Sequence, residues 1–226
     1  MKGKTVFIDI DGTITHDTSG NSEVGYFEYA LRNLLERKYH LTVSEALKKV
    51  LKAEEKVIGK DPFLALSYLD FNVSKEELWR EILKVQKKVL KVYSDAVYFV
   101  RGLYEMGYNL YIVSNNTTNR ALAKLIRAGL ANLKGSKYFK KIYGYDFTSC
   151  QKNSPDFYRK VLNDREFNIE SIVMVGDDSV CDMEIPKEAG IKNFIIVNRK
   201  QKKNILKRDG AYFVNNLILM LKILKR

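Results

Sequence analysis

Short apolar runs rich in β-branched and aromatic residues recur along this chain, and segments with helical periodicity separate most of them. The runs predict strands at residues 5–10, 109–113, 141–145, 171–175 and 193–197, with 211–214 as a candidate last edge strand. Helical patterns fall at residues 95–106, 118–129, 154–164 and 180–189. Because strands alternate with helices, the pattern favours an α/β fold, in which helices cover both faces of a parallel sheet.

The segment at residues 17–93 interrupts this alternation. It lacks a convincing strand pattern and shows helical stretches at residues 24–38, 43–58, 63–69 and 74–92. Ser74, with Glu77 three residues later, forms a capping box at the start of the last stretch. A structureless loop of this length is uncommon in a compact protein. We therefore predict an inserted helical subdomain at 17–93, and a sheet domain formed by residues 1–16 and 94–226.

The composition is that of a globular protein without a membrane span. Hydrophobic residues make up 46% and charged residues 29% of the 226 residues, so the chain can bury a full core. No apolar run approaches the roughly 18 residues that a bilayer requires, and the N-terminus lacks a signal-peptide pattern. We expect a cytoplasmic protein that contacts no membrane, with reduced thiols at Cys150 and Cys181. The apolar stretch 217–224 is predicted as a helix that closes the sheet.

The net charge of +12 raises the concentration of anions near the surface. The lysines are spread over residues 48–60, 84–91, 134–141 and 200–208, and no compact block of them stands beside interleaved aromatic residues. This spread is typical of a solvated surface, so a nucleic acid is not the expected partner.

Two aspartates end the first predicted strand. Asp9 and Asp11 stand two residues apart and therefore leave the strand on the same side. Their negative charges repel each other unless a cation or a proton lies between them. A helix cap or an Asx-turn at Asp11 and Gly12 is an alternative explanation of Asp11. That alternative leaves Asp9 unexplained inside an apolar run, so the pattern favours a functional carboxylate pair.

Further polar residues follow the other predicted strands. In an open parallel sheet, ligands bind beyond the carboxyl ends of the strands. The candidates at those ends are Ser114, Asn115, Asn116, Lys152, Asp177, Asp178 and Asp182. Carboxylate oxygens without a nearby His or Cys suit Mg²⁺ better than zinc. A magnesium ion beside a carboxylate lets that carboxylate attack phosphorus, because the ion screens the repulsion from the phosphate oxygens. Lys152 and Ser114 would hold the remaining phosphoryl oxygens.

These motifs, in this order, resemble the haloacid dehalogenase superfamily, and specifically its phosphatase branch. The matching residues are Asp9-Ile10-Asp11-Gly12-Thr13, Val113-Ser114-Asn115, Lys152, and Val175-Gly176-Asp177-Asp178 with Asp182. The resemblance covers the whole predicted sheet domain and implies a Rossmann-like core. It also identifies 17–93, between the first and second motifs, as a helical cap similar to that of the phosphoglycolate phosphatase group.

The lysine motif departs from the family's common pattern. Family members often have proline directly after the lysine, whereas Asn153 and Ser154 follow Lys152 here. Lys140 and Lys141 therefore remain alternatives to Lys152.

The resemblance implies roles for individual residues. Asp9 would be the nucleophile that forms an aspartyl-phosphate, and Asp11 would protonate the leaving group and then activate water. Asp9, the backbone carbonyl of Asp11, and Asp177 are the implied magnesium ligands. The residues implied to bind the phosphoryl group are Ser114, Asn115 and Lys152, and those implied to orient bound water or the lysine are Asp178 and Asp182.

The leading prediction is a Mg²⁺-dependent phosphatase that hydrolyses a small phosphorylated metabolite. A sugar phosphomutase shares every motif and remains an alternative. A haloacid dehalogenase usually lacks the second aspartate and the acidic pair, so Asp11, Asp177 and Asp178 argue against it. A non-enzymatic basic module for nucleic acid or protein is disfavoured by Asp9 and Asp11, because carboxylates in a cleft repel polyanions when no metal is bound. The sequence indicates neither the exact substrate nor the oligomeric state.

Overall fold

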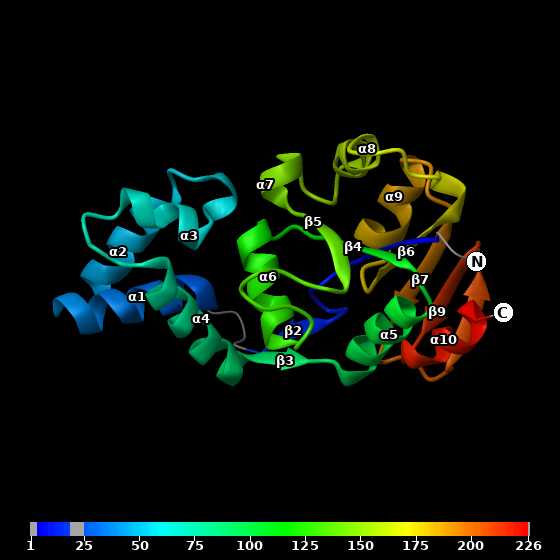
Figure 1. Ribbon diagram of the computed structural model, residues 1–226, viewed down its shortest axis with the longest axis horizontal. Coiled ribbons are helices and arrows are strands. Elements are labelled where there is room, and N and C mark those ends of the chain that lie inside the picture. Colours follow the sequence, from blue (N-terminus) through cyan, green and yellow to red (C-terminus); the bar gives the residue numbers. More distant parts are fainter. Residues whose placement is uncertain (1–3, 19–24, 226) are drawn as a thin grey trace. The chain divides into compact units, whose positions relative to one another are not determined.

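The computed structural model describes residues 4–18 and 25–225, and it contains a seven-stranded sheet (Figure 1). The strand order is β5-β4-β1-β6-β7-β9-β8, and every pairing is parallel except that of β8 with β9. The strands are β1 (Thr5–Ile8), β4 (Asn109–Val113), β5 (Phe139–Tyr143), β6 (Ile172–Gly176), β7 (Asn193–Val197), β8 (Ile205–Arg208) and β9 (Ala211–Val214).

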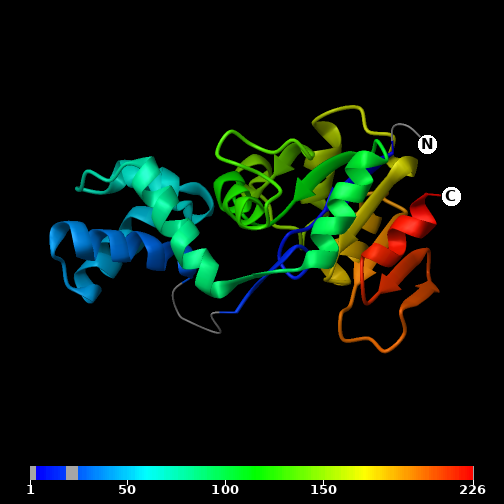
Figure 2. The ribbon, with the colours of Figure 1, turned by 60° about the horizontal axis from the view of Figure 1, so that its bottom comes forward.

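Helices pack on both faces of this sheet because its central strands are apolar on both sides (Figure 2). In β1, Val6 and Ile8 belong to one hydrophobic core and Phe7 to the other. The first core includes side chains of α5 (Ser94–Glu105), α6 (Thr118–Arg127) and α10 (Ile218–Leu224). The second includes side chains of α8 (Pro155–Asn163), and Ile185 of α9 (Ile185–Glu188) packs against it. The short helix α7 (Tyr145–Thr148) precedes α8. The predicted α/β fold class is confirmed.

The far edges of the sheet differ from the sequence prediction. Strand β5 begins two residues before the predicted stretch 141–145, because the buried Phe139 pairs with Leu110 of β4. The stretch 211–214 is β9 and not the edge, since β8 pairs beyond it. All four residues of β8 are exposed, so no apolar alternation marked it as a strand. The predicted helix 180–189 is a π-helical turn, Val180–Glu184, followed by α9.

The chain divides into two compact units, residues 1–16 with 92–226 and residues 17–91. The second unit contains α1 (Tyr26–Tyr39), α2 (Val43–Glu54), α3 (Pro62–Ala65), α4 (Lys75–Val89) and the 3-10 turns Ile58–Lys60 and Leu66–Tyr68. Its core includes the buried side chains Leu31, Leu35, Val50, Leu78 and Ile82. The identification of this segment as a cap stays a prediction.

The helix boundaries of this unit refine the sequence prediction. The capping box at Ser74 and Glu77 is confirmed at the start of α4. Of the predicted helix 24–38, Val24 lies outside the described residues, and α1 begins at Tyr26. Two short strands that were not predicted, β2 (Thr15–Asp17) and β3 (Leu90–Val92), form a separate two-stranded sheet.

None of the described helices combines the length and the apolar character that crossing a bilayer requires.

Candidate active site

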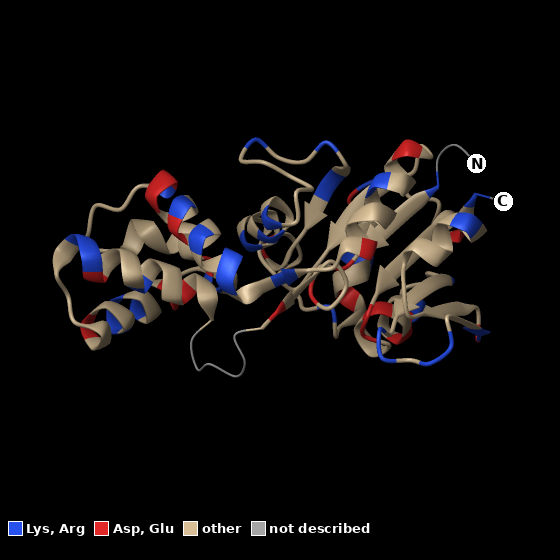
Figure 3. Cartoon of the chain, turned by 90° about the horizontal axis from the view of Figure 1, so that it is seen from below, with Lys and Arg blue, Asp and Glu red and all other residues tan. Residues whose placement is uncertain are grey.

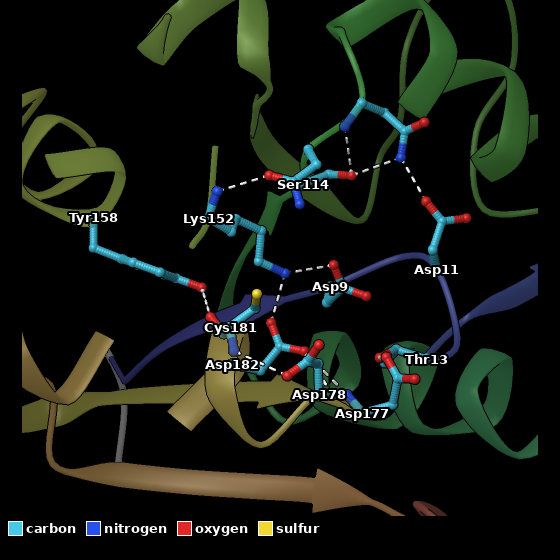
Figure 4. A network of polar contacts seen from close by, with 12 residues as sticks. Asp9, Asp11, Thr13, Ser114, Lys152, Tyr158, Asp177, Asp178, Cys181 and Asp182 are labelled. Carbon is cyan, nitrogen blue, oxygen red and sulfur yellow. Dashed lines mark hydrogen bonds and ion pairs between the residues drawn. The ribbon is translucent and has the colours of Figure 1, made fainter. Parts of the chain in front are cut away.

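The carboxyl ends of β1, β4 and β6 meet because β1 pairs with both of the other strands (Figure 4). Asp9 follows β1 directly, and its backbone N–H donates to the carbonyl of Val175 in β6 at 2.9 Å. This bond continues the sheet one residue past the strand, which fixes the position of the Asp9 carboxylate. Ser114 follows β4, and its N–H donates to the carbonyl of Tyr143 at 3.0 Å.

A buried ion-pair cluster lies at this edge. Lys152 Nζ donates to Asp9 Oδ1 at 2.6 Å and lies 2.5 Å from Asp182 Oδ1. The exposed fractions of the three residues are 6% for Asp9, 3% for Lys152 and 1% for Asp182. Lys152 therefore occupies the predicted place beside Asp9. Lys141, an alternative from the sequence, instead pairs with Asp164 at 2.8 Å.

The loop that carries Lys152 is tethered to the end of β4. The backbone N–H of Lys152 donates to Asn115 Oδ1 at 2.7 Å. The structure thus uses the carbonyl oxygen of the Asn115 side chain to hold the lysine loop. Ser114 Oγ is buried and accepts hydrogen bonds from the N–H of Asn116 at 3.1 Å and from its Nδ2 at 2.8 Å. No acceptor for the hydroxyl proton of Ser114 is found in the described part of the chain, so this hydroxyl can donate to an anionic ligand.

The three aspartates after β6 have different hydrogen-bond partners. Asp182 Oδ2 accepts from the backbone N–H groups of Asp177 and Asp178, each at 3.1 Å. Asp178 Oδ1 accepts from the N–H groups of Val180 at 2.8 Å and Cys181 at 3.0 Å, which holds the start of the π-helical turn. Asp182 thereby shapes the loop and neutralises Lys152. The carboxylate of Asp177 accepts from Thr13 Oγ1 at 3.3 Å and, among the described residues, from no backbone N–H.

Two glycines allow this close approach. A Cβ at Gly12, whose φ is +78°, would collide with the carboxylate of Asp177. A Cβ at Gly176 would collide with the carboxylate of Asp182. Any larger residue at either position would displace the carboxylate beside it.

Negative charge exceeds positive charge in this cluster. Burial raises the pKa of Asp9 to about 8, and repulsion from Asp182 and Asp11 adds to this effect against the attraction of Lys152. Partial desolvation and repulsion from Asp182 also raise the pKa of the more exposed Asp177, to about 6. A bound divalent cation would attract the ionised carboxylates and so lower the pKa values of Asp9 and Asp177 again.

The donor set fits a hard cation. One carboxylate oxygen from each of Asp9, Asp177 and Asp182 lies within 4.8 Å of the others. Because both oxygens of Asp182 already have partners, Asp9 and Asp177 are the carboxylates better placed to hold an ion. Oxygen donors without His or Cys suit magnesium.

The carboxylate of Asp11 has a partner that the sequence analysis missed. Lys124 Nζ, from α6, lies 2.6 Å from Oδ1 and 2.7 Å from Oδ2 of Asp11, and 3.0 Å from Asn116 Oδ1. Asn116 Nδ2 donates to Asp11 Oδ2 at 2.6 Å, which links Asp11 to Ser114. Partial desolvation alone would raise the pKa of Asp11, whose side chain is about half exposed, but Lys124 and Asn116 outweigh this effect and lower the pKa.

A signal for Lys124 was present in the sequence. On α6 it stands three residues after the buried Ala121 and next to the buried Leu125, so it lies on the apolar side of the helix. A lysine on such a face needs a charged partner. The periodicity could indicate its burial, but it could not name Asp11 as the partner.

The comparisons with known proteins agree with this geometry. The family model described as haloacid dehalogenase-like hydrolase matches residues 6–196. A search of curated proteins gives no match.

Three solved structures illustrate the shared fold. A haloacid dehalogenase-type phosphatase from Thermococcus onnurineus is 23% identical and has a TM-score of 0.57, with 98% of this chain and 97% of that chain covered. A 2-haloacid dehalogenase from Pseudomonas syringae is 17% identical with a TM-score of 0.60, over 100% and 99% of the two chains. A Thermotoga maritima protein provisionally assigned as a β-phosphoglucomutase is 21% identical with a TM-score of 0.57, over 100% and 99%. These similarities span three activities and establish the fold alone, whereas the family match extends over most of the sequence. The chain belongs to the haloacid dehalogenase-like hydrolases.

Proposed function

We propose that the protein is a Mg²⁺-dependent phosphatase that hydrolyses phosphomonoesters of small metabolites through an aspartyl-phosphate. The observation that carries the proposal is the pairing of two aspartates with two different buried lysines. Asp9 contacts Lys152 and Asp11 contacts Lys124. These separate partners support a role for Asp9 as the nucleophile and for Asp11 as the group that transfers protons.

Asp9 is the nucleophile in this proposal. Its Oδ1 accepts from Lys152, and among the described residues no donor bonds to Oδ2, which is therefore the oxygen that attacks phosphorus. The new bond joins Oδ2 to phosphorus, and the bond between phosphorus and the ester oxygen breaks. Lys152 and the Ser114 hydroxyl stabilise the negative charge on the phosphoryl oxygens.

Asp11 acts first as the general acid and then as the general base in this proposal. In its protonated form it donates to the departing ester oxygen, so the leaving group departs as an alcohol. The resulting carboxylate then takes a proton from the water that attacks the aspartyl-phosphate, which releases inorganic phosphate and restores Asp9. Lys124 and Asn116 favour the ionised form that this second step requires.

Asp9 and Asp177 would hold the magnesium ion, with the backbone carbonyl of Asp11 as the ligand implied by the family resemblance. The ion would supply positive charge that lets an anionic nucleophile approach an anionic substrate. An acidic residue at position 11 together with Asp177 favours phosphate chemistry over dehalogenation.

Hydrolysis of p-nitrophenyl phosphate tests the proposal. We expect phosphate release with Mg²⁺, none with excess chelator, and loss of activity in Asp9→Asn. Asp156→Asn is the matched control, because Asp156 is an exposed aspartate that pairs with Arg159 on the surface of α8. Full activity in Asp9→Asn would exclude Asp9 as the nucleophile.

A further inference from the structure

A cavity of about 520 Å³ adjoins Asp177 of the candidate active site, within the unit that contains the seven-stranded sheet. Gly12 and Asp177 form one side of it, and the segment after β7 and the β8–β9 hairpin form the other. That segment leaves the sheet as an extended loop, seen in orange in Figure 2 and blue along most of its length at the lower right of Figure 3. Because Gly12 and Asp177 also belong to the candidate active site, the cavity opens beside it.

Arg199 connects the two segments that line opposite sides of this cavity. Its Nη1 donates to the carbonyl of Gly12 at 3.2 Å, and its Nη2 donates to the carbonyl of Thr13 at 3.1 Å. Nη2 also pairs with Asp95 at 3.0 Å, and the guanidinium lies 3.7 Å from the centre of the Tyr93 ring. These contacts tie the segment after β7 to the Asp11–Thr13 turn and compensate the charge of Arg199.

Two other cations line the cavity and lack such compensation. Within the described residues, neither Lys200 nor Arg208 has a carboxylate at ion-pair distance, and both are exposed. The Arg208 guanidinium stacks 4.4 Å from the centre of the Phe213 ring. Stacking holds the plane of the guanidinium and leaves its in-plane N–H groups free for an acceptor. Asp177 is the one acidic residue in the described lining, so the far side of the cavity is positive.

We propose that this cavity binds an anionic group, a phosphate or carboxylate carried by a small molecule, through Arg208 and Lys200. Its volume lies within the range of small-molecule pockets. Arg208 suits a planar or tetrahedral oxyanion because it can donate two parallel hydrogen bonds, and Lys200 adds a second charge. The anion belongs either to the substrate, as a group beyond the phosphate ester, or to a separate molecule. The first source rests on the proposed phosphatase activity, and the second does not.

Binding of inorganic phosphate to the metal-free protein tests the site without catalysis. With chelator present, the carboxylates of the active site repel phosphate, whereas the cavity's cations remain. We expect calorimetry to show binding to the natural chain and a loss of affinity of about tenfold or more in Lys200→Gln/Arg208→Gln. The matched control is Lys202→Gln/Lys203→Gln, which removes the same amount of charge from the loop that carries Lys200, at positions outside the cavity lining. No binding, or equal loss in both double variants, would overturn the proposal.

Two substrates that differ in one anionic group distinguish the sources. 3-Phosphoglycerate carries a carboxylate where glycerol 3-phosphate carries a hydroxymethyl group. A KM that rises in Lys200→Gln/Arg208→Gln for the first substrate alone assigns the anion to the substrate. If the double variant loses phosphate binding but keeps the KM of the natural chain for both substrates, the cavity binds a separate anion. If neither substrate nor p-nitrophenyl phosphate is hydrolysed, the phosphatase proposal fails while the binding result still decides the site.

Discussion

Lys124 is the residue whose contacts most change the view of this site. It bridges both oxygens of Asp11, so in Lys124→Met the one remaining side-chain donor to that carboxylate, within residues 4–18 and 25–225, would be Asn116. We expect kcat/KM, which reports the step in which the leaving group departs, to fall roughly 100-fold for glycerol 3-phosphate, because a displaced Asp11 no longer protonates the departing alkoxide. The fall should be much smaller for p-nitrophenyl phosphate, because nitrophenolate leaves without a proton. Lys124→Arg should recover part of the activity.

Lys141→Met is the matched control, since Lys141 also pairs with an aspartate but lies on β5 beside Asp164. An equal fall of kcat/KM for both substrates in Lys124→Met would show that Lys124 merely supports the fold.

The same contact predicts a change in pH dependence. Lys124 and Asn116 lower the pKa of Asp11 in the natural chain, so its base form persists at lower pH. In Lys124→Met the pKa of Asp11 should rise, and the acidic limb of kcat should move to higher pH. A pH–rate profile from about pH 4 to 8, read with the dephosphorylation step limiting, measures this shift. An unmoved limb would contradict the assignment of Asp11 as the base.

Residue identity and order could be read from the sequence, but contacts across the fold could not. Asp9, Lys152 and Asp182 form a buried cluster, and their candidacy followed from their positions after predicted strands. Lys124 was missed because a helix pattern shows which face is buried and not which side chain meets that face. Asn115 was predicted to bind the phosphoryl group, and the structure shows its side-chain oxygen accepting from the Lys152 backbone. Its predicted role in substrate binding stays a prediction.

At the scale of elements, strands flanked by apolar neighbours were predictable and exposed ones were not. β1, β4, β6 and β7 are buried on both faces, so continuous apolar runs marked them. β8 is held by pairing with β9 and exposes every residue, so pairing and not burial determines it.

The capping box at the N-terminus of helix α4 predicts a pH-dependent contribution to stability. Glu77 accepts from Lys38 and from the backbone N–H of Ser74, and these bonds lower its pKa to about 2. Because the folded pKa lies below the unfolded value of 4.5, the stabilisation is complete above that value and disappears as pH falls toward 2. Glu77→Gln keeps the cap acceptor but removes the charge. We expect its Tm to lie below that of the natural chain at pH 7, with the gap narrowing toward pH 3 in thermal melts. A gap that does not vary with pH would contradict this account.

At the scale of the whole molecule, the acidic cluster links metal binding to stability. The folded chain holds Asp9 and Asp177 with raised pKa values of about 8 and about 6, and an ion that binds them stabilises only the folded state. At 100 times its Kd, such an ion adds about 2.7 kcal/mol to the free energy of unfolding. For a chain of this size, the Tm should therefore rise by roughly 5–10 °C in Mg²⁺. Asp177→Asn should abolish most of this rise, whereas Asp156→Asn should keep it. Differential scanning calorimetry with Mg²⁺ and with chelator measures both, and a full Mg²⁺ shift in Asp177→Asn would place the ion elsewhere.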